Sequence, residues 1–288
     1  MLGFSLPALG WSSAHDPLLA SMQKIRPLFK PKASPQPGDW LAEHRETGQT
    51  YREFRAQVRS RAVDAFATIR IVPIGALSTG QKAVLDVTVD FMKPFFGLPI
   101  VLDPAISESS IPANAQRQLS GAGTRQLLTR YLLEDALLQR RRQSDAAVLG
   151  ITAADLWPGA GWNFVFGQAS LSERVGVWSM ARNGYPDSRP DRRKICALRT
   201  AMTATHETGH MFGIRHCIAY ECGMNGSNHL DERDRQPLEF CPECQAKIWW
   251  ALKLDPLARS RALEAVARRH EFGRVAAGFA RQAAVLAT

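Results

Sequence analysis

The segment HETGHMFGIRH, from His206 to His216, decides the fold of this sequence of 288 residues. On a helix, His206 and His210 project from one face because they are four residues apart, so their imidazole nitrogens can bind one metal ion. Gly213 can adopt a positive φ angle that ends the helix and turns the chain, which brings His216 back as a third ligand. Three neutral nitrogen ligands with one open position predict a catalytic Zn²⁺ site.

Glu207 follows the first histidine on the same predicted helix. A carboxylate beside the metal can take a proton from a zinc-bound water that attacks a carbonyl, and can return it to the leaving amine. The segment therefore predicts a zinc metallopeptidase, a hydrolase that cleaves peptide or protein substrates with Glu207 as the general base. The physiological substrate, the cleavage preference and the choice between endo- and aminopeptidase do not follow from these residues.

Four further cysteines lie close to this segment. Cys217 and Cys222 form a C-x4-C pair, and Cys241 and Cys244 form a C-x2-C pair. Two disulfides would also satisfy this spacing, but they require an oxidising compartment. The opening MLGFSLPALGW has no positively charged stretch before its short apolar run, unlike a secretory signal. We therefore expect a cytoplasmic protein in which the four cysteines have metal-ligand spacing.

The composition indicates a folded chain with a buried core. Hydrophobic residues make up 45% of the sequence, and no stretch approaches the roughly 18 uninterrupted apolar residues that span a bilayer. The formal net charge of +9 suits an acidic substrate or a nucleic acid. No basic stretch is interleaved with aromatic residues, as it is in single-strand binders. We therefore expect that the protein does not bind a membrane, and we consider nucleic acid an unfavoured partner. The oligomeric state does not follow from the sequence, and we favour a monomer.

Strand and helix patterns alternate through the middle of the chain, which predicts an α/β layer. Strands are expected at 68–75 (TIRIVPIG), 99–102 (PIVL), 147–152 (AVLGIT), 163–168 (NFVFGQ) and 175–180 (VGVWSM). Helices are expected at about 84–95, 124–142 and 198–212. Within the first of these helices, VTV at 87–89 also fits a strand.

The chain divides into three predicted regions. Residues 1–60 form an N-terminal extension in which prolines interrupt long elements and a short helix follows at about 39–57. This extension is expected to pack on the catalytic domain, and it could also cover the cleft as an inhibitory segment. Residues 61–255 form the metalloprotease domain, and residues 256–288 form a C-terminal helical segment with arginines among alanines.

These motifs resemble the archaemetzincin (archaelysin) family of metzincin proteases. The resemblance rests on HETGHMFGIRH with the following CIAYECGM and CPEC, and on AVLGIT, NFVFGQAS and NGSNHLDERDRQPLEFCPEC elsewhere. It implies that two zinc ions are bound, one catalytic and one structural. The implied roles are His206, His210 and His216 as catalytic zinc ligands, Glu207 as base, Met224 as the Met-turn methionine, and Cys217, Cys222, Cys241 and Cys244 as structural zinc ligands.

The family also implies an α/β (α+β) fold of the metzincin-like zincin type. A twisted mixed sheet with packed helices would lie above the cleft, and a smaller cysteine-rich, zinc-bound subdomain would lie below it. Within that fold, NFVFGQ would be an edge strand to which an extended peptide can add. The alternative is that Phe164 and Phe166 simply pack inward.

A different class of function stays open on the sequence alone. The pI of about 9.7 and the paired cysteines would suit a non-catalytic zinc-binding protein that binds nucleic acid or a protein partner. Such a protein would not need Glu207 between two histidines. We therefore favour the peptidase.

Overall fold

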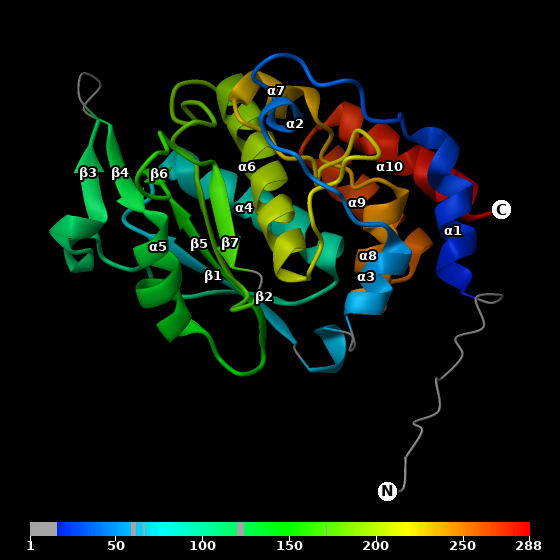
Figure 1. Cartoon of the computed structure of the whole chain (residues 1–288), viewed down its shortest axis with the longest axis horizontal. Coiled ribbons are helices and arrows are strands. Elements are labelled where there is room, and N and C mark those ends of the chain that lie inside the picture. Colours follow the sequence, from blue (N-terminus) through cyan, green and yellow to red (C-terminus); the bar gives the residue numbers. More distant parts are fainter. Residues whose placement is uncertain (1–15, 59–61, 66, 120–123, 171) are drawn as a thin grey trace, which may run out of the picture.

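The computed structural model describes residues 16–58, 62–65, 67–119, 124–170 and 172–288. In this part of the chain the larger sheet has the strand order β2-β1-β5-β8-β7 (Figure 1). Its first four members pair in parallel, and β7 pairs antiparallel with β8 at the edge. The strands of this sheet are β1 (Thr68–Ile74), β2 (Ile100–Leu102), β5 (Asp145–Thr152), β7 (Gly167–Ser170) and β8 (Val175–Ser179).

A smaller sheet extends beyond the larger one. It has the order β3-β4-β6, with an antiparallel β3-β4 pair and a parallel β4-β6 pair. Its strands are β3 (Gln116–Gln118), β4 (Arg125–Leu128) and β6 (Asp155–Trp157). Together the two sheets give the mixed α/β architecture that the sequence predicts.

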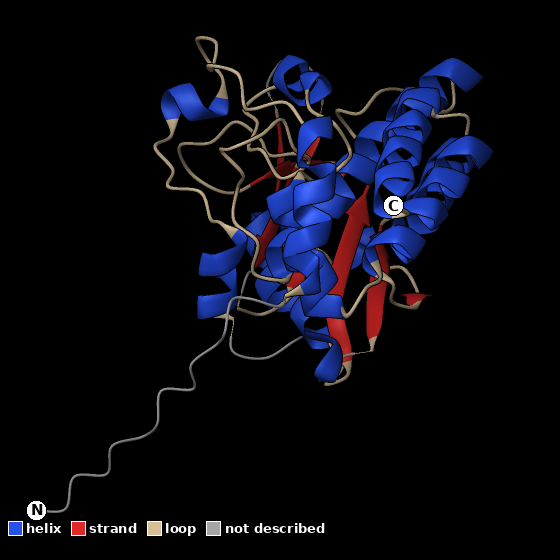
Figure 2. Ribbon diagram, turned by 90° about the vertical axis from the view of Figure 1, so that its right-hand side faces the viewer, coloured by secondary structure: helices blue, strands red, loops and turns tan. Residues whose placement is uncertain are grey.

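Helices pack beside the strands, which run through the middle of the molecule (Figure 2). The long helices α4 and α6 pack against each other, and α6 also contacts β7 and β8. None of the helices in the described residues is long and apolar enough to cross a membrane. The helices are α1 (Pro17–Ile25), α2 (Trp40–Glu43), α3 (Tyr51–Gln57), α4 (Thr79–Phe96), α5 (Thr129–Tyr131), α6 (Pro190–Met211), α7 (Leu230–Arg235), α8 (Pro242–Leu252), α9 (Pro256–Arg269) and α10 (Gly273–Leu286).

The central strands β5 and β8 are buried on both faces of the sheet, which suits their hydrophobic sequences. Every residue of β5 and of β8 is buried, as expected for parallel strands between helical layers. The predicted strands at 68–75, 99–102, 147–152 and 175–180 are confirmed, since they correspond to β1, β2, β5 and β8. Helix α4 is confirmed as well, and the strand alternative at 87–89 is wrong because a capping box at Ser78 and Gln81 starts one continuous helix.

Three sequence predictions need correction. The helix expected at 124–142 is wrong at its start, because Arg125–Leu128 pairs with strands on both sides as β4. The strand expected at 163–168 begins only at Gly167. The segment 39–57 forms two short helices, α2 and α3, instead of one. The C-terminal segment is helical as predicted, and its two helices, α9 and α10, pack on each other.

The two terminal segments share one hydrophobic core with the sheet. Met22 and Phe54 from the N-terminal side and Phe279 from α10 belong to the same buried cluster as Ile69 of β1. Helix α1 packs against α8 and α10, so the first and last described helices lie side by side (Figure 1). The described part of the N-terminal extension, residues 16–58, thus packs against the cysteine-bearing helix α8 through α1 and α3. The first 15 residues of the extension lie outside the described part of the chain.

Candidate functional site

Helix α6 carries the first two histidines of the motif on one face. The helix ends at Met211 with Phe212 as its C-cap residue, and Gly213 follows with a φ of 84°, a conformation that costs glycine little. The Ile214 amide then donates to the Gly209 carbonyl at 3.2 Å, which closes the end of the helix. The chain therefore turns back after Gly213 and brings His216 beside His206 and His210, as predicted.

Each of the three imidazole rings is oriented by a hydrogen bond at Nδ1. With an oxygen acceptor at Nδ1, the proton lies on that atom and the Nε2 lone pair is free. Such partners also fix the orientation of histidines that bind metals. The bonds join His206 to the Gly223 carbonyl (2.9 Å), His210 to the Ile214 carbonyl (2.7 Å) and His216 to Glu46 Oε1 (2.7 Å).

The three rings together fit a zinc ion. One ring nitrogen of each histidine lies within 4.8 Å of the other two, and the Nε2 atoms of His206 and His210 are 3.0 Å apart. Zinc–nitrogen bonds of 2.0–2.1 Å in a tetrahedron place ligand nitrogens about 3.3 Å apart. Burial and the neighbouring histidines lower the pKa of His210 to about 4 and that of His206 well below its usual range. Both rings are therefore neutral, as metal binding requires.

Glu207 is the carboxyl group beside these rings. It is 7% exposed, and within the described part of the chain no hydrogen bond reaches its carboxyl oxygens. Burial raises the pKa of Glu207 to about 8, although the positive charge of Arg233 opposes that rise. A carboxyl group whose pKa lies near neutrality can both accept and donate a proton in catalysis.

Two glycines allow close packing around this centre. A Cβ atom at Gly167, on the edge strand β7, would lie 2.7 Å from Glu207 Oε1. A Cβ atom at Gly209, on α6, would lie 2.6 Å from Met224 Sδ. Met224 is fully buried, so the predicted Met-turn methionine packs directly under the helix that carries the histidines.

A cavity of about 670 Å³ opens beside the histidines. The edge strand β7 and the preceding loop 158–166 form one wall of the cavity, and Trp40 and Arg233 contribute to its other sides. Phe164 and Phe166 are both half-buried and line the cavity. The edge of the sheet therefore faces the candidate catalytic centre, as the sequence predicts for the end of NFVFGQ.

Sequence reasoning missed the residues that reach the centre from the N-terminal segment. Glu46 contacts His216, and the Trp40 ring packs edge-on against the His216 ring with centroids 5.1 Å apart. His44 lies next to Trp40, with ring centroids 4.0 Å apart. The described part of this segment forms a wall of the cavity and orients a histidine. No spacing in the sequence points to these contacts.

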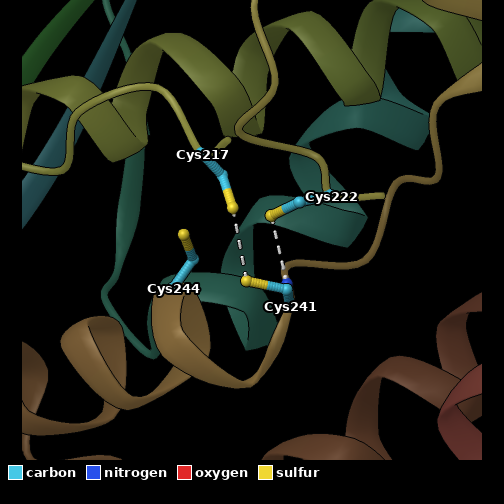
Figure 3. A group of neighbouring side chains, drawn as sticks. All are labelled: Cys217, Cys222, Cys241 and Cys244. Carbon is cyan, nitrogen blue, oxygen red and sulfur yellow. Dashed lines mark hydrogen bonds between the residues drawn. The ribbon is translucent and has the colours of Figure 1, made fainter. Parts of the chain in front are cut away.

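The four cysteines form a second cluster, at the junction of the loop after α6 and the start of α8 (Figure 3). All four are buried, and their sulfur atoms lie within 4.8 Å of one another. Cys217 Sγ and Cys241 Sγ are 3.6 Å apart, close to the separation of about 3.8 Å that zinc–sulfur bonds of 2.3 Å give in a tetrahedron. The side chains are free thiols, so the disulfide alternative is not the arrangement seen.

The two clusters share one loop. The Cys217 amide donates to the Met224 carbonyl at 2.8 Å, and the Asn225 side chain bonds the carbonyls of Cys217 and Tyr220. Because Cys217 directly follows His216, the position of the cysteine cluster sets the position of the third histidine. The role of Asn225 in holding this loop was not predicted.

A third group of possible ligands is already satisfied by hydrogen bonds. Asp39, His229 and Glu232 lie close together, but Asp39 pairs with Arg235 and Glu232 accepts from two backbone amides. His229 caps helix α7 through its Nδ1 atom. This network attaches the segment around Trp40 to α7 and needs no metal.

Comparison with known proteins identifies similar chains. The model of Peptidase family M54 matches residues 138–249. Archaemetzincin-2 of Rattus norvegicus is 33% identical over 269 residues, covering 82% of this chain and 74% of the rat protein. Archaemetzincin of Pyrococcus furiosus is 31% identical over 184 residues, covering 62% of this chain and 91% of its own. The crystal structure of archaemetzincin from Methanopyrus kandleri superposes with a TM-score of 0.51 at 28% identity, covering 66% of this chain and 97% of that one.

Proposed function

This chain belongs to the archaemetzincin family of zinc metallopeptidases, and on that basis we propose that it hydrolyses peptide bonds at the three-histidine centre. We assign the catalytic zinc to His206, His210 and His216 and the general base to Glu207. One observation carries the proposal: the three histidine rings are oriented by hydrogen bonds at Nδ1, and one nitrogen of each lies within 4.8 Å of the other two. Beside them lies the buried carboxyl group of Glu207, which accepts no hydrogen bond from any described residue.

The chemistry divides between the metal and the chain. Zinc bound here would supply a Lewis acid that polarises a peptide carbonyl and makes water more acidic. Glu207 takes the proton of the attacking water and transfers it to the nitrogen of the leaving amine. Its burial suits both steps, because the protonated and the ionised carboxyl are close in free energy near neutral pH.

The edge strand β7 is proposed to hold the substrate main chain. One side of β7 pairs with β8, and Gly167, Gln168 and Ala169 line the cavity. An extended peptide can pair with the backbone groups on the free side of such a strand. This places a carbonyl of the substrate next to Glu207, because Gly167 lies against that side chain.

The cysteine cluster is proposed to hold a second, structural zinc. Four thiolate ligands in a buried tetrahedron leave no position for substrate water. We propose that this ion joins the loop after α6 to α8 and so fixes the predicted domain 61–255 as one catalytic unit. The described residues 16–58 and 256–288 pack against it. Reduced cysteines of this kind suit a cytoplasmic location.

The substitution Glu207→Gln tests the proposal. It keeps the size of the side chain but removes the group that accepts a proton. The zinc-loaded variant should retain two zinc ions per chain and the wild-type unfolding temperature, while cleavage of a mixed peptide library falls by at least about a hundredfold. Cleavage at the wild-type rate by the variant would exclude Glu207 as base. A zinc-loaded wild-type chain that cleaves nothing would favour a non-catalytic zinc protein.

A further inference from the structure

Arg233 is a buried cation in the wall of the catalytic cavity. It lies on α7 and is 4% exposed, and it lines the same cavity as Glu207, Thr203 and Asn228. Its Nη1 atom donates to Gln236 Oε1 at 2.9 Å, whereas Nη2 is buried and has no hydrogen-bond partner among the residues that the structure describes. Burial of a guanidinium group with an unpaired donor lowers the stability of the folded state, so the presence of Arg233 at this position calls for an explanation.

No ion pair with another described residue neutralises the charge of Arg233. Among the described residues, no carboxylate oxygen lies within 4.0 Å of its guanidinium nitrogens. Asp234, its neighbour in the chain, pairs instead with Arg199. Glu207 lines the same cavity, and the charge of Arg233 lowers the pKa of Glu207 while the charge of Glu207 raises the pKa of Arg233. Burial lowers the pKa of Arg233 only to about 10, so the side chain stays charged at neutral pH.

A comparison with Arg259 separates this arrangement from ordinary core packing. Arg259 is equally buried and also has an unpaired Nη2 atom. Its guanidinium group, however, lies over the Phe95 ring at 4.3 Å and donates to the Phe95 carbonyl and to Gln245. It does not line the cavity. The guanidinium group of Arg259 is therefore surrounded by groups of the protein core. Arg233, in contrast, lines the cavity in which a substrate would bind.

We propose that Arg233 is a specificity-determining residue that binds a substrate carboxylate close to the cleaved bond. This inference rests on the peptidase function proposed above and names its substrate class: peptides with an acidic side chain, or with the terminal carboxylate, next to the scissile peptide bond. The carboxylate supplies the acceptor that the guanidinium lacks and the negative charge that its burial leaves uncompensated. Thr203 and Asn228 add further polar groups to the lining of this cavity.

The test compares matched peptides with the zinc-loaded full chain. One series places Asp or Asn at each position on both sides of the cleaved bond, and a second series ends in a free carboxylate or an amide. In the first series, we expect kcat/KM to be about 10- to 100-fold higher for Asp than for Asn at one position. Alternatively, in the second series, kcat/KM should be higher by the same factor for the free carboxylate than for the amide. The two series distinguish an acidic side chain from a chain terminus.

Substitutions at Arg233 assign the preference to this residue. Arg233→Met should lower the ratio of kcat/KM for the Asp peptide to kcat/KM for the matched Asn peptide to about one, and Arg233→Lys should retain part of that ratio. The ratio is compared rather than the rate, because Arg233 also influences the pKa of Glu207 and its loss changes the cleavage of both peptides alike. Arg268→Met is the matched control, because it removes a positive charge from the exposed Arg268 on α9. Unfolding temperature and zinc content verify the fold of each variant.

Two outcomes separate this inference from the peptidase proposal. Wild-type cleavage of neutral peptides without any Asp or free-carboxylate preference would overturn the role of Arg233 and leave the peptidase intact. If no peptide is cleaved, the peptidase proposal fails, and the binding of fluorescent Asp and Asn peptides to the Glu207→Gln variant decides the inference. Equal affinity for the two peptides, or a preference that survives in Glu207→Gln/Arg233→Met, would overturn it.

Discussion

Glu46 Oε1 lies 2.7 Å from His216 Nδ1, although 170 residues separate the two in the chain. The carboxylate accepts the Nδ1 proton and thereby directs the Nε2 atom of His216 toward the other two histidines. The N-terminal segment, absent from the metal-binding motif, thus orients the third proposed zinc ligand.

Replacement of Glu46 should weaken zinc binding at the catalytic centre. We expect Glu46→Ala to lower the affinity for the catalytic zinc by about 10- to 100-fold, as loss of a hydrogen-bonded partner of a metal ligand does. The affinity of Glu46→Gln for the catalytic zinc should lie between those of Glu46→Ala and the wild type, because glutamine keeps an acceptor oxygen. Competition with a chelator measures the affinity, and Glu43→Ala, an exposed carboxylate at the end of α2, is the control. An unchanged affinity in Glu46→Ala would contradict the proposed role.

Gly167→Ala should reduce catalysis without unfolding the chain. The added methyl group would lie 2.7 Å from Glu207 Oε1, so the carboxyl group must move away from its position beside the histidines. We expect kcat to fall by about 10- to 100-fold, because misplacing a catalytic group by about 1 Å has effects of that size. Gly273→Ala is the control, since nothing lies within 4 Å of its added Cβ atom. Equal kcat values for the two variants would show that Glu207 tolerates the displacement.

Loss of one cysteine ligand should remove the structural zinc and disturb the catalytic one. We expect Cys244→Ala to bind fewer than two zinc ions and to unfold at least about 10 °C below the wild type, since a bound zinc contributes several kcal/mol to folding. Activity should also fall, because Cys217 and His216 are adjacent. Cys196→Ala is the control, since Cys196 is buried outside the cluster. Zinc counting by mass spectrometry and thermal unfolding measure both effects, and an unchanged zinc count would refute the assignment.

Glu239 should make stability depend on pH. Burial raises the pKa of Glu239 in the folded state to about 7, above its usual value of 4.5. The folded state therefore holds this proton more tightly than the unfolded state, and its contribution to stability is complete below about pH 4.5 and is lost as the pH rises through about 7. We therefore compare the free energy of unfolding of Glu239→Gln with that of the wild type at two pH values. The difference in favour of the variant should be larger at pH 8 than at pH 5, by about 1–3 kcal/mol.

Denaturant unfolding at the two pH values measures this difference. Asp86→Asn removes an exposed carboxylate from α4 and serves as the control. A difference between Glu239→Gln and wild type that is the same at both pH values would mean that the carboxyl group ionises freely in the folded chain.

Local spacing determined much of this protein. The period of the helix places His206 and His210 on one face, and Gly213 supplies the turn that returns His216. Apolar runs at 68–75, 147–152 and 175–180 specify buried strands, because a run of that length and composition is stable only between two covered faces. The cysteine spacing likewise predicts one compact cluster. These features follow from contacts between residues close together in the chain.

Tertiary structure alone decided the contacts that complete the site. Leu128, Leu132 and Leu137 have helical spacing, yet Arg125–Leu128 becomes a strand because β3 and β6 offer backbone partners on both sides. Glu46, in the segment after α2, contacts His216 across 170 positions of the chain, and Arg233 of α7 lines the cavity. Only the tertiary fold brings these side chains to the site. A sequence records periodicity and turn chemistry, whereas the meeting of distant side chains depends on how the whole chain closes around its core.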